Sequence, residues 1–119
     1  MDNKEFGKQL EVRTKRFAVS IIKLSVLLPN MVEGNVIKKQ ITKSGTSIGA
    51  NYREANRSKS NADFKNKIKI CEGEANETVY WLEIIEELHW LETEILQPML
   101  LESNELLALF TSVSHSLKN

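Results

Sequence analysis

The stretch Phe64–His89, with the sequence FKNKIKICEGEANETVYWLEIIEELH, has the most regular pattern in this chain of 119 residues. Apolar or small residues recur at alternating intervals of four and three, a spacing that brings side chains onto one face of an α-helix. We therefore predict a helix of about 26 residues, roughly 39 Å long at 1.5 Å per residue, with one buried face. Its buried positions are expected to be Phe64, Ile68, Cys71, Ala75, Thr78, Leu82, Ile85 and His89.

Helix boundaries are predicted from proline and from residues that cap helices. Pro29 ends a first helix, because proline disfavours the helical conformation in the residue before it. Asn35 is the expected N-cap of a second helix, and Ser60 is the expected N-cap of the third. Thr93–Gln97 is expected to be a connection, with Pro98 in the first turn of a fourth helix, where a missing N–H group is tolerated.

The four predicted helices determine the fold class. No segment alternates with a period of two for long enough to form a strand, and short links join the helices. We therefore predict an all-α fold, an up-down-up-down antiparallel four-helix bundle that forms a single domain over residues 1–119. The other core positions are expected to be Leu10, Phe17, Ile21, Leu24 and Leu28; Ile37, Ile41, Ser44 and Ile48; and Met99, Ser103, Leu106, Phe110, Val113 and Leu117.

The composition excludes several classes of protein. Hydrophobic residues make up 41% of the chain, with five glycines, two prolines and one cysteine, which excludes a disordered tail, a collagen-like repeat and a disulfide scaffold. The longest uncharged stretch, residues 106–117, is shorter than the ~20 residues that a membrane span needs. No secretory signal opens the chain. We therefore expect a cytoplasmic protein without a membrane partner.

Charge is divided unequally along the chain, although the formal net charge is zero. Residues 1–70 contain fifteen Lys or Arg and six Asp or Glu, a net charge of +9, and residues 71–119 contain one Lys and ten Glu, a net charge of −9. Such asymmetry indicates either two halves that neutralise each other within one domain, or a surface for a partner or for nucleic acid. Both interpretations stay open from the sequence.

The second predicted helix is rich in small residues between Ser44 and Ala50, where the sequence is SGTSIGA. Glycine costs about 1 kcal/mol relative to alanine inside a helix. Gly45 and Gly49 therefore predict that a neighbouring helix packs closely against this face.

No pattern typical of a catalytic or cofactor site is present, and we predict neither a cofactor nor a bound metal. Cys71 and His89 occupy predicted core positions, and free cysteine is commonly buried. Glu86-Glu87-Leu88-His89 has the Glu-x-x-His spacing of di-iron bundles, but the second such motif that a di-iron site requires is absent. Phosphate loops and the serine-hydrolase and zinc-protease motifs are absent as well. We predict that the protein is not an enzyme.

A basic patch at the junction of the second and third helices is a candidate nucleic-acid contact. Its arginines are neighbours at i and i+4, and so are two of its lysines. The alternatives for this patch are direct nucleic-acid binding through phosphate contacts, or a face that is solvated or forms salt bridges between subunits. The patch comprises Arg53, Arg57, Lys59, Lys65 and Lys69.

The same junction resembles a known family. The run Gln40–Ala55, QITKSGTSIGANYREA, is similar to the signature of the four-helix-bundle proteins called 23S rRNA intervening-sequence proteins. The resemblance implies a small bacterial protein. For most members of this family no biochemical activity is established. It also implies a link to accessory proteins of diversity-generating retroelements, which form pentameric barrels and contact nucleic acid and a reverse transcriptase. The signature residues at matching positions are Gln40, Ser44, Ser47, Asn51, Arg53 and Glu54.

A structural role is the favoured interpretation of these signature residues. Asn51 and Glu54 lie at the end of the second helix, and we expect them to satisfy unpaired amides at the start of the third.

A second apolar stripe on the third helix predicts self-association. A bundle helix buries about three of every seven positions, so part of this stripe would face water in a monomer, and exposed apolar patches commonly mark interfaces. The divided charge favours a head-to-tail ring, and the number of five subunits follows only from the resemblance. The stripe, a candidate subunit interface, comprises Ile70, Trp81, Ile84 and Leu88.

Two functions are compatible with these observations. The leading hypothesis is a non-enzymatic, homo-oligomeric scaffold or accessory protein that takes part in RNA or DNA metabolism through a nucleic-acid-processing partner. The alternative is a protein that binds nucleic acid directly through the basic patch.

Overall fold

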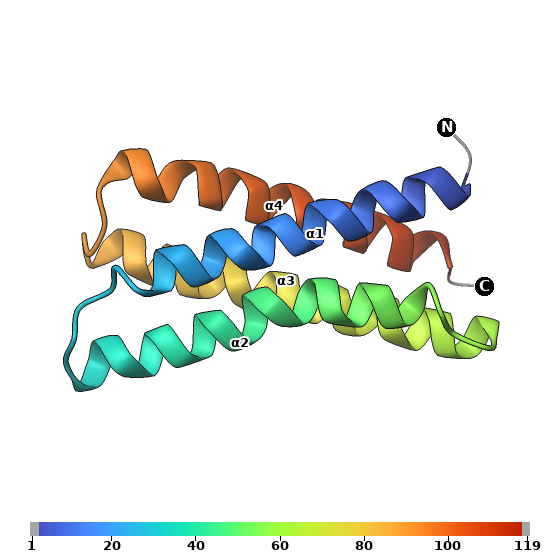
Figure 1. Ribbon diagram of the computed structural model, residues 1–119, viewed down its shortest axis with the longest axis horizontal. Helices are drawn as coiled ribbons and strands as arrows, with labels where there is room; N and C mark the ends of the chain where they lie inside the picture. The colour runs from blue at the N-terminus through green and yellow to red at the C-terminus, as the bar shows by residue number, and fades with distance from the viewer. Residues whose placement is uncertain (1–2, 118–119) are drawn as a thin grey trace.

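The computed structural model describes residues 3–117, which form four α-helices joined by short connections (Figure 1). Successive helices run in opposite directions, and α1 and α3 lie diagonally across the bundle, each between α2 and α4. The predicted all-α four-helix bundle is confirmed. The helices are α1, Asn3–Ser25; α2, Val32–Ala55; α3, Asn61–Glu87; and α4, Thr93–Ser116.

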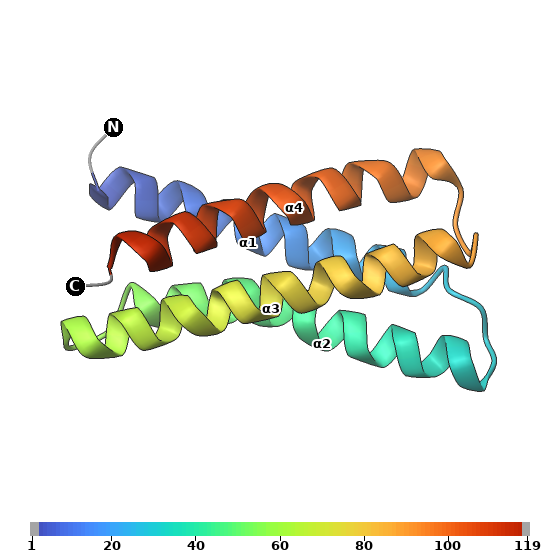
Figure 2. The same cartoon turned by 180° about the vertical axis from the view of Figure 1, so that it is seen from behind.

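The chain termini and the helix connections are divided between the two ends of the bundle. Both chain termini and the α2–α3 turn lie at one end, and the α1–α2 and α3–α4 connections lie at the other (Figures 1 and 2). None of the described helices is long and apolar enough to cross a membrane.

The core is built from the predicted helical faces. The four predicted positions on α1 from Leu10 to Leu24, and Leu28 just after the helix, are all 3% exposed or less, and on α3 the predicted positions from Ile68 to Ile85 are buried. Phe64 and Ile37 are only partly buried and pack against the edge of this core. Buried apolar positions that the periodicity did not identify are Tyr52, Ala55, Val79, Leu96 and Leu100.

The close helix contact predicted at the small residues of α2 is confirmed. A methyl group on Gly45 would lie 2.7 Å from Cγ2 of Ile21, and one on Gly49 would lie 3.1 Å from the Thr14 hydroxyl oxygen, so α1 lies directly against this face. On the α3 side, the buried Ser44 hydroxyl accepts a hydrogen bond from Oγ1 of Thr78 at 2.9 Å. Only small side chains fit between α2 and its two neighbours at this level.

The predicted N-cap at Asn35 is wrong. α2 begins at Val32, and the Asn35 N–H donates to the Met31 carbonyl at 2.8 Å inside the first turn. Gly34 allows this extra turn, because its α-carbon lies against the Pro29 carbonyl group. The first helix likewise ends at Ser25, before Pro29 is reached.

The predicted connection Thr93–Gln97 is also wrong, and so is the placement of Pro98. α4 begins directly after its N-cap residue Glu92, so Pro98 lies in the second turn of the helix. Leu96 is 3% exposed, and burying such a side chain contributes roughly 1.5–3 kcal/mol. This burial offsets the backbone hydrogen bond that Pro98 cannot donate.

His89 is not a core residue, contrary to the prediction, and it lies outside α3. It is exposed and has a φ of 55°, a left-handed conformation in which histidine is among the more tolerated residues. Its N–H donates to the Glu86 carbonyl at 3.1 Å, and the Trp90 N–H donates to the Ile85 carbonyl at 3.3 Å. These two bonds form a Schellman motif, which ends the helix.

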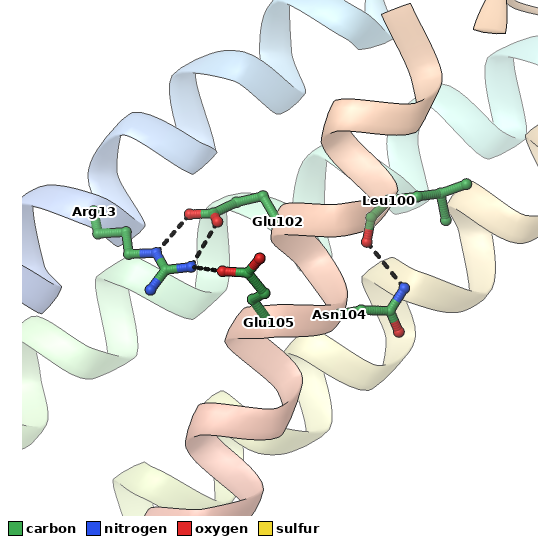
Figure 3. A network of polar contacts seen from close by, with 5 residues as sticks. All are labelled: Arg13, Leu100, Glu102, Asn104 and Glu105. Atoms are coloured by element: carbon green, nitrogen blue, oxygen red, sulfur yellow. Dashed lines mark hydrogen bonds and ion pairs between the residues drawn. The ribbon is translucent and has the colours of Figure 1, made fainter.

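The crossing of α1 and α4 is bridged by one arginine (Figure 3). Nε and Nη2 of Arg13 each donate to a Glu102 carboxylate oxygen at 2.7 Å, and Nη2 also donates to Glu105 at 2.8 Å. The hydrogen bonds to Glu102 hold the pKa of Arg13 above its ordinary value. A basic residue of the first half of the chain thus neutralises acidic residues of the second half within one molecule.

Cys71 is fully buried, as predicted. Its thiol donates a weak hydrogen bond to the Ile48 carbonyl at 3.5 Å. Burial raises the pKa of this thiol to about 12. A thiol in this environment is a packing group and not a nucleophile.

Candidate functional site

A groove of about 820 Å³ runs between α1 and α2 toward the α2–α3 turn. Residues from four consecutive parts of the fold contribute: the middle of α1, the second half of α2, the turn itself and the first turns of α3. The groove is lined by Glu11, Lys15, Ala18, Thr46, Gly49, Ala50, Arg53, Glu54, Arg57, Ser58, Lys59, Asp63 and Lys67.

The floor of the groove consists of small residues. Ala18 on α1 faces Thr46, Gly49 and Ala50 on α2, and the absence of a side chain on Gly49 lets α1 approach to within contact distance of the α2 backbone. The Thr46 hydroxyl donates to the Thr42 carbonyl at 2.7 Å, which leaves its methyl group available to the groove. The floor is therefore mostly apolar, although long charged side chains surround it.

Two of the cations on the groove walls are held by carboxylates. Nε of Arg53 lies 3.6 Å from Oε1 of Glu11, whose other oxygen accepts a hydrogen bond from Asn56 at 2.8 Å. Nζ of Lys67 lies 2.7 Å from Oε1 of Glu54, and this hydrogen bond raises the pKa of Lys67. These contacts orient the two cations along the groove.

The remaining cations of the groove have no such partner. In the described part of the chain, Lys15, Arg57 and Lys59 form no ion pair. With Arg53 and Lys67, they give the groove five cations against three carboxylates. The positive charge of this region is thus only partly neutralised within the molecule.

The predicted nucleic-acid patch is divided by the fold. Arg53, Arg57 and Lys59 line the groove, whereas Lys65 and Lys69 lie on α3 outside its lining. The sequence analysis did not include Lys15, because it is far from the patch in the sequence and only the packing of α1 on α2 brings it there. Lys67 belongs to the same basic run on α3 but was not among the predicted contacts; it lines the groove and pairs there with Glu54.

The capping role predicted for the signature residues Asn51 and Glu54 is wrong. Nδ2 of Asn51 donates back to the Ser47 carbonyl at 2.8 Å, and Glu54 binds the side chain of Lys67. The N-terminus of α3 is instead capped by Ser60, as the sequence predicted. The Ser60 hydroxyl oxygen accepts a hydrogen bond from the Asp63 N–H at 3.1 Å. Signature positions that are buried or half-buried in α2 are Gln40, Ser44, Ser47 and Asn51.

The predicted interface stripe forms part of an outer face of α3. Ile70 and Leu88 are exposed, while Trp81 and Ile84 are half-buried. The ring of Tyr80 stands edge-on to Trp81 with centroids 5.1 Å apart and extends the stripe into solvent, where Tyr80 is 55% exposed. We call this set, Ile70, Tyr80, Trp81, Ile84 and Leu88, the α3 face.

A second exposed apolar face lies on α1, and the sequence analysis missed it. Val12, Val19 and Val26 are 45–66% exposed. Val12 and Val19 lie on one line of α1, on the side opposite the buried line of Leu10 and Phe17, since two residues correspond to about 200° of rotation. Val26, the residue after the end of α1, continues this line, and its N–H donates to the Ile22 carbonyl at 3.3 Å. Ile22 lies beside this line and is 46% exposed. We call this set, Val12, Val19, Ile22 and Val26, the α1 face.

The two faces have opposite charge and opposite orientation. Exposed lysines and arginines, among them Lys15, Arg16 and Lys23, flank the α1 face, whereas Glu83 and Glu87 flank the C-terminal part of the α3 face and Lys69 lies beside its first residue, Ile70. Because α1 and α3 lie diagonally across the bundle, faces that point away from the core on these helices look in opposite directions.

The described residues contain no group of three or more His, Cys, Asp or Glu side chains that could hold a metal ion. The Glu-x-x-His spacing does not lie on one helix, because His89 follows the end of α3. The Glu86 carboxylate accepts a hydrogen bond from Gln97 at 2.8 Å instead.

Comparison with known proteins gives a family and a fold. A family model described as 23S rRNA-intervening sequence protein matches residues 8–112. The chain is similar to a protein of unknown function from the S23 ribosomal protein family of Bacteroides thetaiotaomicron VPI-5482, whose crystal structure was determined at 1.70 Å resolution. The two are 41% identical with a TM-score of 0.80, and the similarity covers 87% of this chain and 96% of that one. No protein with a curated description matches the chain.

Proposed function

This chain belongs to the 23S rRNA-intervening sequence protein family, and from that premise we propose that it is a non-enzymatic accessory protein that acts as a homo-oligomeric scaffold. It works in the bacterial cytoplasm and contributes to RNA or DNA metabolism through a partner protein. The observation that carries the proposal is the pair of exposed apolar faces with opposite charge, one on α1 and one on α3.

Each face is larger than isolated surface residues would require. Val26 is 66% exposed on the α1 face, and Tyr80 and Leu88 are 55% and 48% exposed on the α3 face. Contiguous exposed apolar residues on a protein surface are typical of interaction sites. The apolar set on α1 continues through the α1–α2 connection, where Leu27 and Met31 are exposed, into the first turns of α2, where Val32 and Val36 are exposed.

The opposite orientation of the faces determines the kind of assembly that they favour. When the α1 face of one molecule packs on the α3 face of the next, the basic flank of the first meets the acidic flank of the second, and such complementarity favours this pairing over others. A contact between two different faces is head-to-tail, and it forms a ring where the rotation between successive subunits closes, or an open filament where it does not. The resemblance to pentameric barrels gives five as the expected number of subunits.

We expect light scattering to give a mass near five times 13.6 kDa for the protein at micromolar concentration. The double variant Val19→Glu/Val26→Glu is expected to be monomeric, because it places carboxylates against the acidic flank of the α3 face. The carboxylate introduced at position 19 would lie one helical turn from both Lys15 and Lys23. Opposite charges at this spacing stabilise a helix, so the substitution at position 19 should not unfold the monomer.

Leu101→Glu is the matched control, since Leu101 is an aliphatic residue of α4 that is 63% exposed and lies outside both faces. This variant is expected to keep the mass of the unmodified protein. A 13.6 kDa monomer for the unmodified chain would contradict the assembly, and a dimer would contradict the ring. An unchanged mass for the double variant would show that the α1 face is not the interface.

Direct nucleic-acid binding is the second candidate function, and the convergence of Arg53, Arg57 and Lys59 on one groove favours it. We expect single- and double-stranded oligonucleotides to bind at ~50 mM salt, with log K falling by ~0.9 per duplex phosphate neutralised for each unit of log salt. Fluorescence titration of labelled strands at two salt concentrations measures this slope. The absence of binding at ~50 mM salt, where the electrostatic contribution is strong, would rule this function out.

A further inference from the structure

The groove between α1 and α2 has a charge and a shape that suit a small ligand. Its five cations, from Lys15 to Lys67 along the chain, exceed its three carboxylates by two. A terminal phosphate carries a charge of about −1.5 to −2 at neutral pH, which matches this excess, whereas an internal phosphodiester carries only one negative charge.

The position of the cations along the groove is uneven. Arg57 and Lys59 lie at the α2–α3 turn, and Arg53 lies on the last turn of α2 beside them. Thr46 and Ala18 lie farther from the turn, and Thr46 precedes Arg53 by two helical turns, about 10 Å. One end of the groove is therefore cationic, and the other end is lined by small residues.

The arginines provide the geometry that phosphate recognition requires. Each guanidinium is a planar fork that can donate two parallel hydrogen bonds to phosphate oxygens. The Glu11 carboxylate, 3.6 Å from Nε of Arg53, limits the orientations of that guanidinium without fully engaging it. Arg57 forms no ion pair in the described part of the chain, so its five donors are available.

From these observations we infer that the groove is a binding site for a terminal phosphate on a nucleotide-sized ligand. The phosphate lies between Arg53, Arg57 and Lys59, and the sugar and base lie over the floor formed by Ala18, Gly49 and Ala50. The phosphate belongs either to a free nucleotide or to the phosphorylated end of a strand. This site does not depend on the proposed assembly, nor on binding along a strand.

Isothermal titration calorimetry at ~50 mM salt, where phosphate contacts are strong, tests the inference with five probes: inorganic pyrophosphate, ADP, adenosine, and a ten-nucleotide oligothymidylate with and without a 5′-phosphate. We expect pyrophosphate and ADP to bind and adenosine not to bind. If the 5′-phosphorylated strand binds at least tenfold more tightly than both ADP and the unphosphorylated strand, the physiological source of the phosphate is a strand end. If it does not, the source is a free nucleotide.

The variant Arg57→Ala/Lys59→Ala is expected to weaken ADP binding at least tenfold, and Lys38→Ala/Lys39→Ala, which removes the same charge from α2 outside the groove, by less than twofold. Equal weakening by the two variants would overturn the site, because it would indicate non-specific attraction to a basic surface. Binding of the unphosphorylated strand without binding of ADP or pyrophosphate would overturn this inference but leave direct nucleic-acid binding intact. Absence of binding by all five probes would overturn both.

Discussion

Alanine at position 34 is expected to destabilise the bundle more than any other single methyl group added to it. A methyl group on Gly34 would lie 1.9 Å from the Pro29 carbonyl oxygen and 2.9 Å from the Pro29 carbonyl carbon. Both are backbone atoms of the α1–α2 connection, so no rotation of a side chain relieves the overlap. We expect Gly34→Ala to lower the free energy of unfolding by about 3 kcal/mol, at the upper end of the usual cost of overpacking.

Gly73→Ala is the matched control for this substitution. Gly73 lies inside α3, and a methyl group there would have no atom within 4 Å. Alanine is favoured over glycine in a helix by about 1 kcal/mol, so this variant is expected to be more stable than the unmodified protein. Urea unfolding followed by circular dichroism measures both. If the two variants shift stability in the same direction, the described packing of Gly34 on Pro29 is incorrect.

Phe110→Ala is expected to have the largest effect among side-chain truncations. Phe110 is fully buried, and its ring meets that of Tyr52 edge-on, with centroids 5.6 Å apart and an interplanar angle of 64°. Removal of a buried phenylalanine ring typically costs about 3–5 kcal/mol, because it loses the transfer free energy and leaves a cavity. The edge-to-face contact adds ~0.5–1.5 kcal/mol to such a loss.

Phe6→Ala provides a control in which the same atoms are removed. Phe6 is 40% exposed on α1, so its removal leaves a site open to water and not a closed cavity, and we expect a cost of ~1 kcal/mol or less. Chemical denaturation of the two variants under the same conditions gives the comparison. Similar losses for Phe6→Ala and Phe110→Ala would contradict the assignment of Phe110 to the core.

The existence of the helices and most of the core could be predicted because both follow from periodicity. Residues spaced by three and four lie on one helical face, whatever the rest of the chain does. The Ser60 cap could also be predicted, since the bond between a hydroxyl and an amide three residues later is local. The close approach of α1 to Gly45 could be predicted because glycine destabilises a helix. A glycine inside a helix therefore indicates a close contact that compensates for this cost.

Predictions of helix boundaries failed where the rules for proline and capping residues did not include the contact that decides the boundary. Pro98 is tolerated inside α4 because Leu96 is buried against other helices, and local rules for proline do not contain that information. Asn35 is a good capping residue, yet the contact between Gly34 and Pro29 carries the helix one turn farther. His89 fitted the periodicity of α3 as its last position, but α3 ends at Glu87, and His89 is itself the left-handed residue that follows the end of the helix.

The functional surfaces could be predicted only in part, for a similar reason. The cations near the α2–α3 turn are close in sequence, whereas Lys15 joins them only through the packing of α1 on α2. The valines of the α1 face repeat every seven residues and could have been recognised. A helix with two apolar lines offers two candidate cores, however, and the sequence does not say which line the other helices cover.

The burial of Cys71 has a practical consequence for measuring the dynamics of this protein. Alkylating reagents attack the thiolate, and a thiol with a pKa of about 12 is ionised at pH 8 in only about one molecule in ten thousand. The reagent must also reach a side chain that has no exposed surface. The thiol therefore reacts almost exclusively in molecules that have transiently opened, and its alkylation rate reports the opening equilibrium of the region where α2 meets α3. The chain thus carries an intrinsic chemical probe of its own fluctuations, with no label to be engineered.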